Sequence, residues 1–111
     1  MLTVETLKEY GANVDEGLGR CMGNKELYLR LVSSVPAEKS FDVLKESIES
    51  GDLNAAFEAA HALKGITGNL ALVPLYEPIV EITELLRARQ EIDYTDLLSG
   101  ILTKKEELGN I

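Results

Sequence analysis

Apolar residues recur every three or four positions along most of this chain, and they do not alternate strictly with polar ones. This spacing places apolar side chains on one face of an α-helix, whereas a half-buried β-strand needs a period of two. Glycines and prolines fall mainly between the periodic segments, where they end or begin helices. The pattern therefore predicts an all-α fold.

Six helices are expected. They run over residues 3–9, 13–21, 24–51, 53–70, 74–89 and 94–108. Thr3, Asn13, Asn24 and Asp52 are residues that cap helix N-termini well. The first two helices are short, and the other four have short connections, which favour antiparallel neighbours. We therefore expect an antiparallel four-helix bundle with short N-terminal accessory helices.

Pro36 interrupts the longest of these segments. A proline inside a helix removes one hydrogen bond and clashes with the preceding turn. We expect one long helix kinked between Ser33 and Pro36, with two separate helices as the less favoured alternative. The apolar side of this segment is predicted to contain Leu27, Leu31, Val35, Val43, Leu44 and Ile48.

Length and charge restrict the kinds of partner. The 111 residues suit a single domain spanning 1–111, and the net charge of −8 argues against nucleic acid and anionic membranes. No apolar run approaches the roughly 20 residues of a membrane-spanning helix, and the segment 1–8 lacks the features of a signal peptide. We expect a cytoplasmic protein, a monomer, with another protein as its partner.

Cys21 and His61 are the only cysteine and the only histidine. One of each is too few for a disulfide framework, a zinc site or a convincing nucleophilic triad. Cys21 is interpreted as a small, semi-buried hydrophobic residue. We expect neither a metal nor a cofactor on this chain.

His61 is predicted to face solvent. On a helical projection, Ala56, Ala59, Leu63, Ile66 and Leu70 fall within roughly 40° of the side opposite His61 and form the buried stripe. A lone histidine in a helix is most often a surface or capping residue without chemistry. The residues that follow it favour a different interpretation.

Two glycines and a lysine follow His61 on or beside its own face. Gly65 and Gly68 lie one and two turns later, and each costs about 1 kcal/mol relative to alanine in a helix interior. They leave room for another protein to approach the imidazole. Lys64 places an ammonium beside the ring, where it can neutralise an oxyanion. An exposed nucleophile beside a cation suits phosphoryl transfer.

The segment His61-Ala62-Leu63-Lys64-Gly65, followed by Gly68-Asn69-Leu70, resembles the signature of histidine-containing phosphotransfer (HPt) domains. The resemblance extends to the preceding proline-containing segment, to the turn at residues 51–53, and to the two later helices. It implies a four-helix bundle with accessory helices. It also implies a phosphoryl carrier that has no kinase site of its own.

The resemblance implies roles for individual residues and partners. His61 would take a phosphoryl group on Nε2 from a receiver-domain aspartate and pass it to another receiver. Lys64 would stabilise phosphoryl charge, and Gly65 and Gly68 would leave room for the receiver. The partners would be response-regulator receiver domains and a hybrid sensor histidine kinase, with Mg²⁺ on the receiver alone.

Other residues near His61 are candidates for partner contact. Phe57, one turn earlier, offers an apolar ring to a partner, or else folds back into the bundle. Glu58 is a candidate partner contact, and the alternative interpretation is a solvated surface charge. Asn69 is a weaker candidate and otherwise ends the helix. Glu77 or Glu81 could hold the second ring nitrogen of His61, but the sequence does not place either.

The chain departs from the commonest family pattern at two places. Ile66 stands where a small residue is frequent, and Ala71-Leu72 replaces the usual glycine after Asn-Leu. Ile66 is predicted to face the core, so it alters packing more than access. Ala71 is expected to change how the helix ends.

The sequence favours two other classes of function less. The main alternative is a helical adaptor of the same fold that binds receivers without being phosphorylated, although Lys64 and both glycines argue against it. An enzyme with its own turnover, such as a hydrolase, lacks acids and bases at a pocket-forming spacing.

Overall fold

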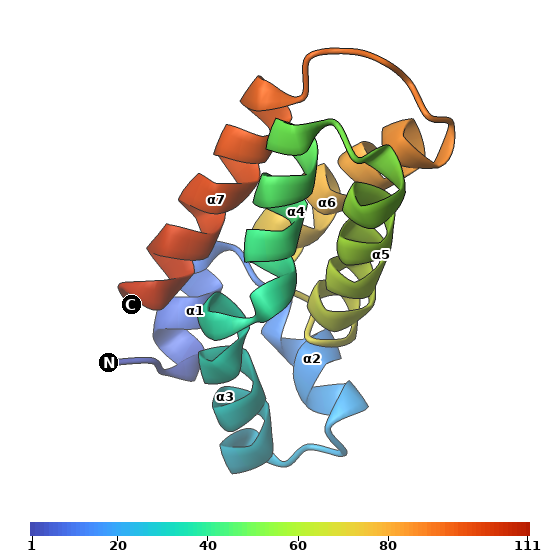
Figure 1. Cartoon of the computed structure of the whole chain (residues 1–111). Helices are drawn as coiled ribbons and strands as arrows, with labels where there is room; N and C mark the ends of the chain where they lie inside the picture. Colours follow the sequence, from blue (N-terminus) through green and yellow to red (C-terminus); the bar gives the residue numbers. More distant parts are fainter.

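The computed structural model describes all residues 1–111 and contains only helices (Figure 1). The α-helices are α1 (Val4–Tyr10), α2 (Val14–Arg20), α3 (Lys25–Ser34), α4 (Lys39–Ser50), α5 (Leu53–Asn69), α6 (Val73–Arg87) and α7 (Thr95–Gly109). A single 3-10 turn, η1 (Val35–Ala37), separates α3 from α4. The predicted all-α fold is confirmed.

The four long helices α4 to α7 form the bundle. α4 packs on α5, α5 on α6 and α6 on α7, and successive helices run in opposite directions (Figure 1). The short helices α1, α2 and α3 lie together at one end of the bundle (Figure 1). The molecule is elongated, measuring 41 × 24 × 19 Å. No helix has the length and apolar character needed to cross a bilayer.

Side chains cap several helices where the sequence predicted caps. Thr3 forms a capping box with Thr6, and Asn13 and Asn24 each accept a backbone N–H from the first turn of their helix. The Asp52 carboxylate accepts the Ala55 N–H at 3.1 Å and begins α5, the helix that contains His61. These bonds satisfy N–H groups that have no partner within the helix.

Pro36 breaks the segment 24–51 into two helices, so the expectation of one kinked helix was wrong. The chain makes the η1 turn, and Glu38 then caps α4 with its carboxylate. Proline has no N–H to donate, which makes a 3-10 turn followed by a fresh helix start a lower-energy solution than a strained kink. Because a single helical projection no longer applies, Leu31 and Val43 are 41% and 44% exposed instead of buried.

The boundaries of the last two helices differ slightly from the predicted ones. α6 begins at Val73, with Pro74 in its first turn, and continues through Pro78. It ends at Arg87, two residues earlier than expected, and α7 begins at Thr95 after Tyr94. The connection between them is the long loop of residues 88–94.

The core is one cluster of buried side chains drawn from all seven helices and the turns between them. Its largest fully buried members include Tyr28, Phe41, Leu44, Leu63 and Leu72. α5 contributes mainly small residues, and its alanines allow α4 and α6 to approach closely. Every buried polar side-chain atom has a hydrogen-bond partner. Cys21 is buried and free, in agreement with its interpretation as a small hydrophobic residue.

α5 ends in a left-handed turn at an alanine. Ala71 has a φ of 55°, a conformation that favours glycine, and its N–H donates to the Gly68 carbonyl. The departure from the usual glycine therefore lies at the left-handed residue that follows the C-cap Leu70. The accessory helices hold this turn, since the Asn13 N–H donates to the Ala71 carbonyl and the Tyr28 hydroxyl donates to the Leu70 carbonyl.

Candidate functional site

His61 lies in the middle of α5 on its exposed face, as predicted. Leu63, on the opposite face, is fully buried. No side chain or backbone group of the chain hydrogen-bonds to either ring nitrogen of His61. Glu77 and Glu81 are exposed and neither pairs with the ring. Both nitrogens are therefore open to an external reactant.

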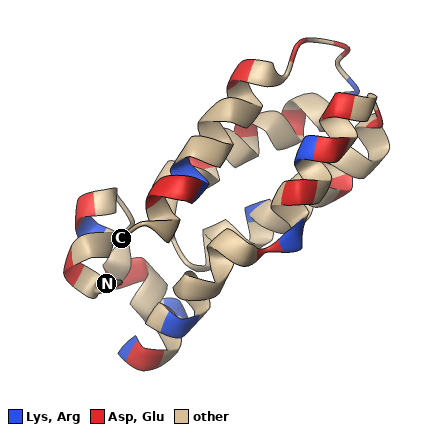
Figure 2. Cartoon of the chain, turned by 60° about the vertical axis from the view of Figure 1, so that its left-hand side comes forward, with Lys and Arg blue, Asp and Glu red and all other residues tan.

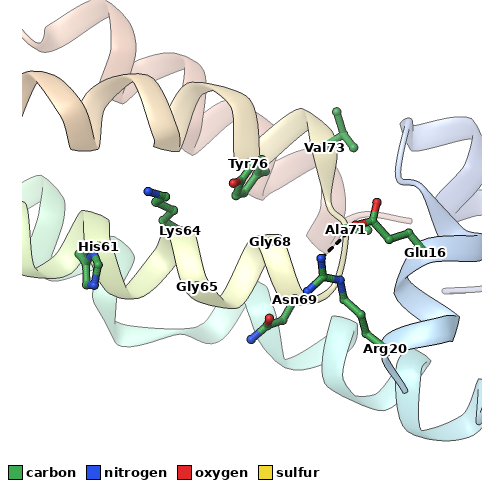
Figure 3. Close-up of a pocket in the computed structure, with 10 residues that line it drawn as sticks. All are labelled: Glu16, Arg20, His61, Lys64, Gly65, Gly68, Asn69, Ala71, Val73 and Tyr76. Atoms are coloured by element: carbon green, nitrogen blue, oxygen red, sulfur yellow. Dashed lines mark hydrogen bonds and ion pairs between the residues drawn. The ribbon is translucent and has the colours of Figure 1, made fainter. Parts of the chain in front are cut away.

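A groove of about 470 Å³ begins at His61 and follows α5 toward its C-terminal end (Figure 3). Its lining comes from α5, from the start of α6 and from α2: Glu16, Arg20, His61, Lys64, Gly65, Gly68, Asn69, Ala71, Val73 and Tyr76. The α2 wall was missed from the sequence, because no spacing rule connects residues some forty positions apart. Tyr76 was missed for a similar reason.

Gly65 and Gly68 differ in what surrounds them. A Cβ built on Gly65 meets no atom within 4 Å, so packing inside the chain does not require a glycine there. A Cβ built on Gly68 lies 2.9 Å from Cε1 of Tyr76, whose ring covers this glycine (Figure 3). Gly68 therefore has a packing role inside the chain. Gly65 has none, although it weakens the helix by about 1 kcal/mol relative to alanine.

Two cations line the groove, and their pairing differs. Lys64 is half-buried and forms no ion pair within the chain. Arg20 pairs with Glu16 on its own helix at 3.1 Å between Nη2 and Oε1 (Figure 3). Lys64, three residues after His61 on the same helix, is therefore the cation that is free to meet an incoming anion.

Phe57 combines the two interpretations that the sequence left open. Its ring is half-buried and packs against the core, yet it also stacks on the His61 imidazole, with centroids 5.8 Å apart and planes 26° apart. Glu58 is exposed and makes no ion pair. Asn69 is the last residue of α5, and its exposed side chain lines the groove without forming any hydrogen bond that caps the helix.

The Hpt domain family model matches residues 33–110, which include α4 to α7 and all the residues around His61. The chain therefore belongs to the Hpt domain family. Neither the curated proteins nor the solved structures returned a significant match. Membership in this family connects the chain with histidine phosphotransfer in two-component systems, where Hpt domains are phosphoryl carriers and work with receiver domains and kinases.

The match begins near the end of α3, so α1 and α2 lie outside it. The α2 wall of the groove, with Glu16 and Arg20, is thus built by the part of the chain that the family model does not cover. The Asn13 N–H, just before α2, donates to the Ala71 carbonyl just after α5, and the Tyr28 hydroxyl of α3 donates to the Leu70 carbonyl beside it.

Proposed function

We propose that His61 accepts a phosphoryl group from the aspartate of one receiver domain and passes it to the aspartate of another. The observation that carries this proposal is the state of the only imidazole in the chain. His61 is exposed in mid-helix, both its nitrogens are free of internal hydrogen bonds, and it adjoins a groove that holds an unpaired lysine. Family membership supports the same reaction.

The transfer needs a nucleophile, a path and charge neutralisation. The Nε2 lone pair of the neutral imidazole attacks the phosphorus, and the N–P bond forms as the P–O bond to the donor aspartate breaks. The aspartate leaves as a carboxylate, and the Nδ1 proton of the imidazolium passes to water. In the second transfer, a carboxylate of the next receiver attacks the phosphorus, the N–P bond breaks, and the imidazole regains a proton. Phosphoryl transfer of this kind depends mainly on positioning and electrostatics.

Two residues beside His61 serve this chemistry directly. Lys64 stabilises the negative charge of the phosphoryl oxygens, and Gly65 leaves its surface bare so that the receiver can come close. Phe57, Glu58, Gly68 and Asn69 contribute to the surrounding contact surface. The Mg²⁺ needed for aspartyl phosphate chemistry belongs to the receiver, and the chain itself needs no cofactor.

Phosphoryl transfer from a radiolabelled receiver tests this function. The purified chain and its His61→Gln variant are mixed with receivers phosphorylated by a small-molecule donor. We expect label on the wild type that is acid-labile and base-stable, as for phosphohistidine, and none on His61→Gln. The variant should keep its fold, because His61 forms no internal hydrogen bond.

The same experiment can contradict the proposal. Equal labelling of His61→Gln would place the phosphoryl group elsewhere. If no receiver from the source organism labels the wild type, while one binds wild type and His61→Gln with equal affinity, the chain acts as an adaptor instead.

The contribution of Lys64 has its own test. Lys64→Ala should slow transfer on the order of tenfold, equivalent to about 1.4 kcal/mol in the barrier. Lys45→Ala on α4 is the matched control, since Lys45 is exposed and lies outside the groove. Equal rates for the two variants would show that Lys64 does not contribute to the rate of transfer.

A further inference from the structure

A cluster of one aromatic ring and two guanidinium groups lies beside His61, toward the N-terminal end of α5. The Cζ atoms of Arg87 and Arg89 are 5.0 and 5.2 Å from the centroid of the Phe57 ring, and that ring stacks on the His61 imidazole. Guanidinium groups at this distance are attracted to the electron-rich face of an aromatic ring. The cluster therefore adjoins His61 on the side away from the groove.

The structure holds Arg89 in place at some conformational cost. Its backbone is left-handed, with a φ of 54°, which is unfavourable for a residue with a Cβ. Nε donates to Oδ1 of Asn54 at 2.8 Å, and Nη1 donates to the Leu86 carbonyl at the end of α6 at 2.6 Å. Asn54 lies one turn before Phe57 on α5, so these bonds fix the guanidinium over the ring.

Both arginines keep donors that nothing in the chain uses. Arg87 pairs only through Nε, with Glu84 at 3.1 Å, which leaves its two Nη groups without a partner. Nη2 of Arg89 forms no hydrogen bond either. Both residues are exposed. The two free Nη groups of Arg87 match the two oxygens of a carboxylate, and Arg89 can donate to a carboxylate through Nη2.

The charge of the whole chain makes this cluster unusual. The net charge is −8, and Asp and Glu are spread over the helices in Figure 2, with fewer Lys and Arg between them. Such a protein repels other acidic surfaces except where its own cations gather. The ion pair with Glu84 offsets part of the charge of Arg87, whereas Arg89 has no carboxylate partner. The two guanidinium groups over Phe57 therefore provide a local attraction beside the ring that stacks on His61.

We propose that Phe57, Arg87 and Arg89 form a contact surface that binds acidic side chains of the receiver domain exchanging phosphoryl groups with His61. This proposal rests on the proposed function of His61. The aromatic ring and Asn54 orient the guanidinium groups, and the free Nη donors bind carboxylates of the receiver. His61 then lies between this surface at one end and the groove with Lys64 at the other.

The test is the salt dependence of phosphoryl transfer from a labelled receiver. The double variant Arg87→Gln/Arg89→Gln is compared with Lys25→Gln/Arg30→Gln on α3, which changes the net charge by the same amount on a helix that packs on α2 and η1. Second-order rate constants are measured at about 0.01 M and about 1 M salt, where the Debye length is about 30 Å and about 3 Å.

We expect the cluster variant to react at least about tenfold more slowly than the wild type at low salt, with the difference mostly lost at high salt. The control should stay within about twofold of the wild type. Equal rates for the cluster variant and wild type would overturn the proposal. An equal loss in the control would also overturn it, because the effect would then come from net charge alone.

Two further measurements separate the possible causes. Phosphoramidate phosphorylates imidazole without a receiver, and it should label the cluster variant and the wild type equally; slower labelling of the variant would show that the arginines act on His61 itself and would overturn the proposal. Because losing the Asn54 bond can loosen the loop, Arg87→Gln alone is tested too, since its only bond is within α6. It should show a smaller loss with the same salt dependence, and wild-type rates would count against the proposal.

Receiver binding distinguishes failure of the proposed phosphotransfer from failure of the proposed contact surface. If no receiver labels the wild type, calorimetric titration with unphosphorylated receivers still tests the surface. Weaker binding by the cluster variant but not by the α3 control would support the contact surface without phosphotransfer. Equal binding would overturn it.

Discussion

The two faces of α5 differ in whether packing within the chain explains their residues. The buried face consists of Ala56, Ala59, Ala60, Leu63 and Thr67, and each has a packing or hydrogen-bonding reason to be there. The exposed face carries a histidine with no internal hydrogen bond and a glycine with open space around it. Packing therefore explains the first face and leaves the second unexplained, and a residue that weakens a helix without an internal reason indicates an external one.

Leu63→Ala should have the largest effect on stability. Leu63 is fully buried two residues after His61, and its truncation leaves a cavity between helices, which costs about 2–5 kcal/mol. Urea unfolding followed by circular dichroism measures the loss. At a temperature where the variant is folded, labelling of His61 should persist. A loss below about 1 kcal/mol would mean that this face is less tightly packed than described.

Tyr28→Phe should cost less at neutral pH and should change the response to alkali. The Tyr28 hydroxyl donates to the Leu70 carbonyl at the end of α5 at 2.9 Å, a bond worth about 1 kcal/mol. Burial raises the pKa of Tyr28 above its ordinary value, so the unfolded chain loses this proton first as the pH rises. The contribution of the protonated Tyr28 to the free energy of unfolding is therefore present below about pH 10 and is lost as the pH rises above it.

Urea unfolding of wild type and Tyr28→Phe at about pH 8 and about pH 11 measures this difference. The variant should lose less stability between the two pH values. It should still lose some, because burial also raises the pKa values of Tyr10 and Tyr94. Parallel losses in the two proteins would show that Tyr28 does not contribute to the alkaline transition.

Gly65→Ala should stabilise the chain and impair transfer. A Cβ at this position has open space, so the helix gains about 1 kcal/mol. Gly100→Ala on α7 is the matched control, since its Cβ also meets nothing within 4 Å. Both variants should unfold at higher urea concentrations, but only Gly65→Ala should slow phosphoryl transfer from a receiver. Normal transfer by Gly65→Ala would show that the approach of a receiver does not require a glycine at this position.

Gly68→Ala should have the smallest net effect on stability. Its helix propensity gain is offset because the new Cβ, 2.9 Å from Cε1 of Tyr76, forces the ring to move. In a Tyr76→Leu background, Gly68→Ala should recover a gain nearer to that of Gly65→Ala. A double-mutant cycle by urea unfolding measures this coupling. No coupling would mean that the Tyr76 ring does not oppose a side chain at position 68.

Much of the fold follows from sequence because its signals are local. Helical periodicity and the N-caps Asn13, Asn24 and Asp52 predict which segments are helical and where several of them begin. The break at Pro36 was not resolved by the pattern, because the helical periodicity continues on both sides of the proline, whether the chain kinks or makes a 3-10 turn with a new cap at Glu38.

The candidate site divides in the same way. The exposure of His61 was predictable, since it depends only on the position of a residue around one helix. The neighbours brought by other parts of the chain were not predictable. These are Arg20 from α2, Tyr76 and Arg87 from α6, and Arg89 from the loop that follows α6. Tertiary packing alone sets these contacts, and no spacing along the chain encodes them.

The exposure of the His61 ring has a consequence for the lifetime of the phosphoryl group that we propose it carries. The ring lies on the exposed face of α5, so a phosphoryl group on it would face solvent as well as the aspartate of the next receiver. Delivery would then compete with hydrolysis. The fraction of phosphoryl groups delivered would depend on how soon the next receiver is met, and hence on receiver concentration.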